Sequence, residues 1–153
     1  MACEYVYPEA QSVSLNTPAL FRDSIPCRRG YVYHANEEGI FILRGIVNNQ
    51  CACYAQYQVV FNGNIAIPEG GTVTPIAIAI TVNGEPKRSS RAIVTPAAVE
   101  EFGNVTSTAI IKVPRGCCFN IAIENVSASE DPTVTPAPVI TLQDANLTIS
   151  RIA

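Results

Sequence analysis

Apolar and polar residues alternate with a period of two over several short stretches of the chain. The clearest case is residues 76–82 (IAIAITV), in which isoleucines occupy every second position and small residues lie between them. The same alternation recurs in residues 57–62, 118–125 and 146–152. A period of two is typical of strands that bury one face, so the pattern predicts an all-β protein. The predicted core residues are Phe61, Ile78, Ile80, Phe119, Ile121 and Ile149.

Turn-forming residues separate these stretches. Asn-Gly pairs occur at residues 62–63 and 83–84, Pro-Glu-Gly-Gly at 68–71, Pro-Arg-Gly at 114–116, and a proline-rich run at 132–138. Each of these favours a tight change of direction. The spacing predicts about ten short strands arranged as a two-sheet antiparallel jelly-roll sandwich.

The sequence favours one folded unit with little helix. Thr95 and Pro96 suit the start of a helix, so we expect a single helical turn within residues 95–102. No repeat of fixed period and no long linker divides the chain. We expect an N-terminal arm or first strand over residues 1–20 and a jelly-roll domain over residues 21–153.

Charge and hydropathy exclude several classes of partner. The net charge is -3, and the ten basic residues are scattered, so neither nucleic acid nor an anionic membrane surface is an expected partner. No apolar run approaches the roughly 18 residues of a membrane span, so membrane insertion is not expected. The first ten residues (MACEYVYPEA) lack the basic and apolar regions of a classical signal peptide.

Four segments together resemble the bacterial tumour-necrosis-factor-like (TNF-like) jelly rolls: residues 39–45 (GIFILRG), 57–86, 104–127 and 146–153 (NLTISRIA). The resemblance implies a two-sheet sandwich that forms a threefold trimer. Bacterial domains of this type are similar to the heads of collagen-like spore-surface proteins and of some phage surface proteins. The chain has no Gly-X-Y stalk, so any tethering is expected from the first 20 residues.

Catalytic signatures are absent from the sequence. His34 is the one histidine, and no nucleophile motif accompanies it. The glycine pair at 70–71 precedes a predicted strand, whereas a phosphate-binding loop precedes a helix. We therefore predict that the protein is not an enzyme and needs no cofactor.

Six cysteines present three alternatives: covalent structure, buried thiols or metal ligands. Cys51 and Cys53 are expected on one face of a strand, and Cys117 and Cys118 on opposite faces, so bonds within either pair are disfavoured. With Cys27, these four are candidates for structural disulfides or buried thiols. Metal is the third choice because the pairs are too tight for the usual zinc loop. Cys3 lies near the N-terminus and is the candidate for a bond between subunits.

Two functions follow from these observations. The first is a structural protein that assembles with itself, as a trimer or as an extracellular filament or surface layer on a cell, spore or virion. The β-prone residues Tyr5, Val6 and Tyr7 favour this function, because such an arm can pack on a neighbour as an added strand. The alternative is a phage or surface adhesin whose head recognises a receptor or a glycan.

Overall fold

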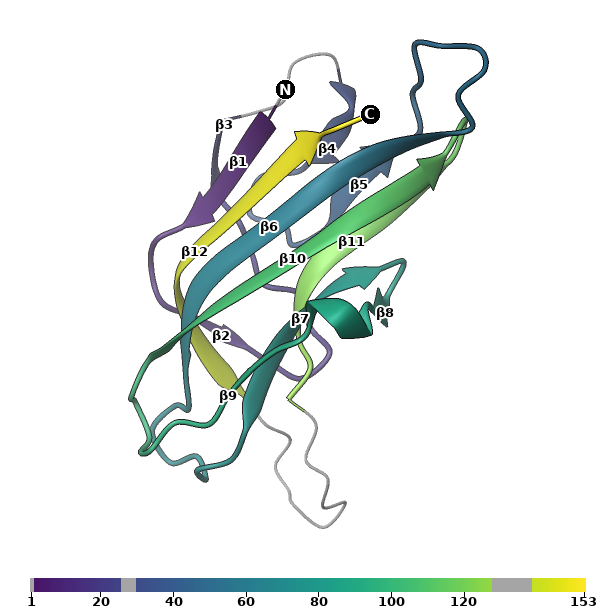
Figure 1. Cartoon of the computed structure of the whole chain (residues 1–153). Coiled ribbons are helices and arrows are strands. Elements are labelled where there is room, and N and C mark those ends of the chain that lie inside the picture. The colour runs from purple at the N-terminus through teal and green to yellow at the C-terminus, as the bar shows by residue number, and fades with distance from the viewer. Residues whose placement is uncertain (1, 26–29, 128–138) are drawn as a thin grey trace.

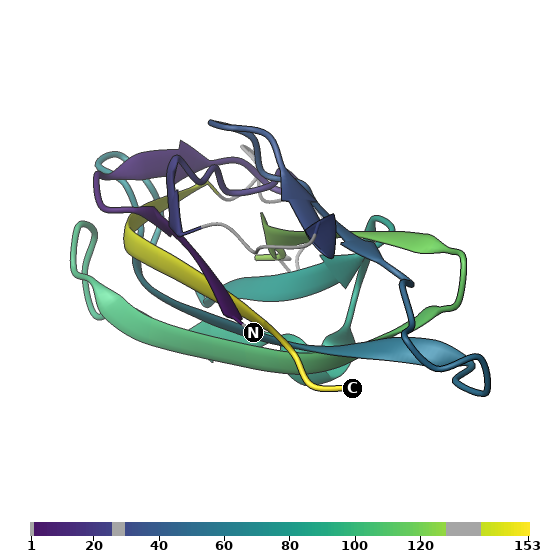
Figure 2. The same cartoon turned by 90° about the horizontal axis from the view of Figure 1, so that it is seen from above.

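The computed structural model describes residues 2–25, 30–127 and 139–153, which form two antiparallel sheets packed face to face. Figure 1 shows the long strands of one sheet running diagonally across the molecule, and the view from above separates the two layers (Figure 2). The predicted two-sheet all-β sandwich is thus confirmed. The described residues contain twelve strands, and the additional ones are short.

Sheet A contains the longest strands. Its order is β10-β6-β12-β1-β3, and β2 pairs separately with β12. The strands are β1 (Ala2–Tyr7), β2 (Gln11–Val13), β3 (Asp23–Ile25), β6 (Tyr54–Ala66), β10 (Gly103–Pro114) and β12 (Ile140–Arg151).

Sheet B is built from shorter strands. Its order is β4-β5-β11-β7-β8, and β9 pairs with β7. The strands are β4 (Val32–His34), β5 (Phe41–Arg44), β7 (Ile76–Val82), β8 (Glu85–Pro86), β9 (Ala92–Val94) and β11 (Cys118–Asn125).

The core lies between the sheets and follows the predicted alternation. Phe61, Ile78, Ile80, Ile121 and Ile149 are all buried, whereas Phe119 is partly buried and packs against the edge of the core. Ring-to-ring packing adds to this burial, since Phe21 meets both Phe41 and Phe61 edge-on. The period-two pattern therefore identified the inner faces correctly.

Small residues on β7 and β10 are already covered within the chain. Ala77 and Ala79, which alternate with the core isoleucines, are buried, and Ala109 belongs to the inward-facing row of β10. No second subunit is needed to cover these alanines.

The sequence left open whether the N-terminal residues form an arm or a first strand. In the structure, residues 2–7 form a strand. β1 pairs with β12 along its whole length, from Ala2 opposite Ser150 to Tyr7 opposite Ala145, and with β3 on its other side. Alternate residues of β1 face the core, which holds the strand in the sheet. Residues 2–7 are therefore part of the sandwich.

Two local predictions are wrong. Residues 95–102 form a turn and not a helix; Glu100 has a φ of 61°, and the 3-10 turn of this region is η2 (Arg88–Ser90). Asn62 and Gly63 lie inside β6, where a side chain at Gly63 would come within 2.9 Å of Leu142 and Phe61. The glycine there makes room for core packing.

The other turn predictions hold wherever the structure describes them. Asn83 and Gly84 both have positive φ and join β7 to β8 as a two-residue hairpin. Gly70 and Gly116 also have positive φ in their turns. The proline-rich run at 132–138 lies outside the described residues.

Candidate assembly surfaces

The outer face of sheet A is formed by the longest strands that the structure describes. The register of β10, β6, β12 and β1 places their outward residues in rows across the sheet. Three adjacent rows make up what we call the sheet A face: Thr106, Asn62, Asn146, Val6; Thr108, Val60, Thr148, Glu4; and Ile110, Gln58, Ser150, Ala2. Glu4 carries the one charge in these rows.

Hydrogen bonds hold the polar side chains at one end of this face. Asn104 Nδ2 donates to Asn62 Oδ1 at 3.0 Å and lies 3.2 Å from Asn64 Oδ1. Thr106 Oγ1 donates to the same Asn62 oxygen at 3.1 Å, and Asn146 Nδ2 donates to Glu4 at 3.2 Å. These bonds restrict short side chains that already have little rotamer freedom, so less entropy is lost when a partner packs on them.

The residues predicted to pack an N-terminal arm on a neighbour lie within their own chain. Tyr5 is buried and meets Phe41 edge-on at 4.7 Å between ring centroids; burial raises the pKa of its hydroxyl. Tyr7 is half-buried beneath the Arg22 guanidinium, and Val6 is half-buried on the sheet A face. Packing of this segment on another subunit stays a prediction.

His34 has a structural environment. Its ring stacks on Phe41 at 4.2 Å, and Nε2 lies 2.7 Å from the carbonyl oxygen of Glu38. In the described part of the chain, no group of three or more His, Cys, Asp or Glu residues is placed to hold a metal. Nor does any described helix have the length and apolar character of a membrane span.

Solved structures of other proteins have a similar architecture. No family model and no curated protein matches the sequence. The globular domain of zebrafish complement 1qA protein matches with a TM-score of 0.62 over 99% of this chain and 97% of that chain, at 14% identity. The fold is TNF/C1q-like. Two further structures have the same fold. Eiger TNF from S. frugiperda matches with a TM-score of 0.63 at 11% identity, over 100% of this chain and 92% of that chain. Murine APRIL matches with a TM-score of 0.60 at 11% identity, over 99% of this chain and 98% of that chain.

Within this TNF/C1q-like sandwich, Cys3 is a core residue. It lies on β1 opposite Ile149, is 1% exposed and is disulfide-bonded. A bond from Cys3 to another subunit would require this disulfide to break and β1 to leave its sheet. The predicted bond between subunits stays a prediction, and Cys27 lies outside the described residues.

The other four cysteines lie on the surface. Cys51, Cys53, Cys117 and Cys118 are free and exposed, rather than joined in the cross-strand disulfides or buried as the thiols that the sequence predicted. The two pairs occupy neighbouring connections at one end of the sandwich, because β6 begins where its partner β10 ends. The sequence alone could not predict that the two cysteine pairs lie close together, because their proximity depends on which strands pair.

A cavity of about 250 Å³ opens on the outer face of sheet B. Ile40 and Ala122 contribute apolar surface, and Asn83 and Asn120 contribute polar groups. Glu124 is the one charged residue among the described residues that line it. Burial raises the pKa of the Glu124 carboxyl, and a hydrogen bond with Thr81 partly opposes this shift. The sequence analysis missed this site because its residues come from four separate segments.

Proposed function

We propose that the protein is a non-enzymatic structural protein that forms homo-oligomers, most simply trimers, through the sheet A face. The observation that carries this proposal is the composition of that face. Its three rows contain uncharged side chains with Glu4 as the one exception, and the centres of protein interfaces are similarly depleted in charge. A trimer is also what the resemblance to TNF-like jelly rolls implies.

The assembly is proposed to act outside the producing cell, on a cell, spore or virion surface. The resemblance to bacterial spore-surface and phage surface heads supports this location. A trimer can be the final form or the unit of a filament or surface layer, and no catalytic step enters either form.

A charge placed in the middle row of the sheet A face tests the proposal. Thr108 is exposed in the single chain and lies in the middle row, so Thr108→Arg should leave the fold intact while burying an unpaired charge in the interface. We expect wild-type protein to have about three times the 16.4 kDa chain mass in light scattering, and the variant to have the chain mass.

Thr72→Arg is the matched control, because Thr72 is an exposed residue in the connection that follows β6. It should keep the wild-type mass. Monomeric wild-type protein, or a Thr108→Arg variant with unchanged mass, would contradict assembly through this face.

The cavity on sheet B favours a second function, recognition of a glycan by a surface head. Its size and its mixture of amide, carboxylate and apolar groups suit a sugar residue. Glu124→Gln should abolish retention on a glycan array, and wild-type retention should decrease as the pH is lowered through the raised pKa of Glu124, because the carboxylate loses its charge. Glu69→Gln, at the far end of the sandwich, should bind like wild type. Equal retention by Glu124→Gln would rule out this cavity as the site.

A further inference from the structure

Two connections between the sheets meet at one end of the molecule. Residues 45–53 lead from β5 to β6, and residues 115–117 lead from β10 to β11. Backbone hydrogen bonds join them: Arg115 N donates to Cys53 O at 2.9 Å, Gly45 N to Cys117 O at 2.8 Å, and Gly116 N to Gly45 O at 3.0 Å. These hydrogen bonds hold four cysteines together at one end of the sandwich. We call this group the thiol tip: Cys51, Cys53, Cys117 and Cys118.

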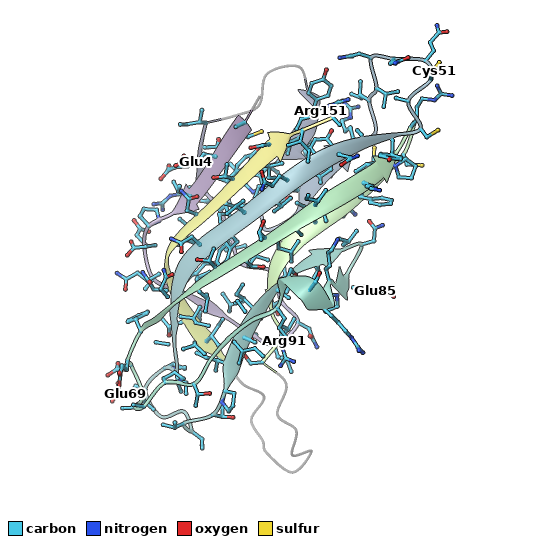
Figure 3. The ribbon with its side chains drawn as sticks, viewed as in Figure 1. Glu4, Cys51, Glu69, Glu85, Arg91 and Arg151 are labelled. Carbon is cyan, nitrogen blue, oxygen red and sulfur yellow. The ribbon has the colours of Figure 1, made fainter. Side chains whose placement is uncertain are left out.

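The thiol tip lies at an extremity of the molecule. Figure 3 labels Cys51 at one end of the long strands and Glu69 near the other. All four tip cysteines are exposed and free. They form no metal-holding group among the described residues, and adjacent Cys117 and Cys118 are poorly placed to bond to each other. The thiols are thus accessible to a partner in solution.

The charged side chains in the chain segments that form the tip are all basic. Residues 39–68 and 102–123 contain no Asp or Glu, whereas Arg44, Lys112 and Arg115 are exposed. Arg44 pairs with Cys118 across the strands, which places both side chains on the same face of sheet B. Arg115 donates to Gln50 O at 2.6 Å and so lies across both connections. This positive field attracts small molecules that carry carboxylates.

We propose that the thiol tip exchanges with carboxylate-bearing low-molecular-weight disulfides and thereby links copies of the chain covalently. In the first step a tip thiol, after losing its proton, attacks one sulfur of the disulfide; the S–S bond breaks, a mixed disulfide forms and one small thiol leaves. In the second step a tip thiolate of another copy attacks the protein sulfur of the mixed disulfide. The bond between copies forms and the second small thiol leaves, so the small disulfide is the oxidant for both protein thiols.

The first step also prepares the second. Two unmodified tips repel each other because each carries basic residues and no acidic ones. A bound carboxylate-bearing half-molecule reduces that repulsion, so a modified tip accepts an unmodified one more readily. Since each chain has four tip thiols, a copy can bond to more than one neighbour. The proposal does not depend on the sheet A face, because the tips lie at an end of the sandwich.

The experiment follows cross-linking by oxidised glutathione of full-length protein whose tip thiols are reduced and whose Cys3 disulfide is intact. The reaction is quenched by alkylation and analysed on a non-reducing denaturing gel. We expect a ladder of reducible species that extends beyond the dimer. Replacing all four tip cysteines with serine should leave only monomer, and restoring Cys118 alone should stop the ladder at dimer. Peptide mapping should find the tip cysteines in the bonds between chains.

The matched control moves the thiol to the other end. Thr72→Cys in the four-serine background presents one exposed thiol near Glu69, Glu100 and Glu101, which repel an anionic disulfide. Its dimer should form roughly tenfold more slowly than that of the Cys118-only variant. Cystamine, which is cationic, should reverse the order of the two variants.

Several results would overturn the proposal. They are mixed disulfides without bonds between chains, bonds formed only within one chain, a ladder that persists in the four-serine variant, and equal rates for the Cys118-only and Thr72→Cys variants. A circular-dichroism spectrum typical of β-sheet in each variant ensures that the comparison concerns folded protein. Because denaturation separates any non-covalent trimer, these results do not depend on the light-scattering test of the sheet A face.

Discussion

At each end of the sandwich, two connections between the sheets run side by side. Residues 45–53 and 115–117 meet at the thiol tip, and residues 67–75 and 95–102 meet at the opposite end, where Glu100 N donates to Ile67 O at 2.7 Å. The first end carries basic residues and thiols. The second carries Glu69, Glu100 and Glu101 without a basic residue in its two connections. A shared architecture thus sets where the connections meet but leaves their chemistry to vary independently.

One glycine from each end, Gly45 at the thiol tip and Gly70 at the acidic end, shows a difference in packing. A Cβ atom at Gly45 would lie 2.0 Å from the carbonyl oxygen of Pro114, and its neighbours there are backbone atoms. A Cβ atom at Gly70 would meet nothing within 4 Å, although its φ of 82° disfavours a side chain. A side chain at Gly45 is therefore opposed by contact between the two connections, and a side chain at Gly70 by local backbone conformation.

The largest effect that distinguishes the ends is expected from Gly45→Ala. This change should lower the free energy of unfolding by about 3 kcal/mol or more, because backbone must move to relieve the contact. Gly70→Ala should lower it by about 1 to 2 kcal/mol through the left-handed φ alone. Urea unfolding of both variants measures the difference. If Gly70→Ala were the more destabilising change, the two connections at the thiol tip would not be in tight contact.

The smallest effect is expected at the acidic end. Glu100 has a φ of 61°, so Glu100→Gly should relieve strain and raise the free energy of unfolding by about 0.5 kcal/mol, once the greater entropy of glycine in the unfolded chain is subtracted. Glu101 does not have a positive φ, so Glu101→Gly is the control and should not raise the free energy of unfolding. Equal stabilisation by both would attribute the effect to removal of negative charge.

Local sequence patterns predicted much of the fold. Strand periodicity placed Phe61 and Ile121 in the core because it reads the direction of side chains along an extended backbone. It failed at Asn62-Gly63, which has the composition of a hairpin turn, because packing beside Phe61 and Leu142 overrides local preference. The same limit explains residues 95–102, where the backbone hydrogen bond to Ile67 joins segments far apart in sequence.

The candidate sites depended even more on tertiary structure. The sequence analysis weighed each cysteine by its immediate neighbours, so Cys3 in an N-terminal segment looked accessible and the two close pairs looked structural. Pairing of β1 with β12 buries Cys3, and pairing of β6 with β10 brings Cys53 and Cys117 to one exposed end. Strand partners cannot be read from periodicity, so neither outcome was predictable from the residues alone.

The position of β12 in sheet A constrains how the chain reaches its native state. β12 lies between β6 and β1, and Cys3 of β1 pairs with Ile149 of β12, nearly the full length of the chain away. Pairings of such high contact order form slowly, because a long loop must close before they contribute stability. During synthesis on the ribosome, β1 and β6 emerge first and wait with unpaired edges until β12 follows. The nascent chain is thus most exposed to mispairing with other chains just before β12 is released.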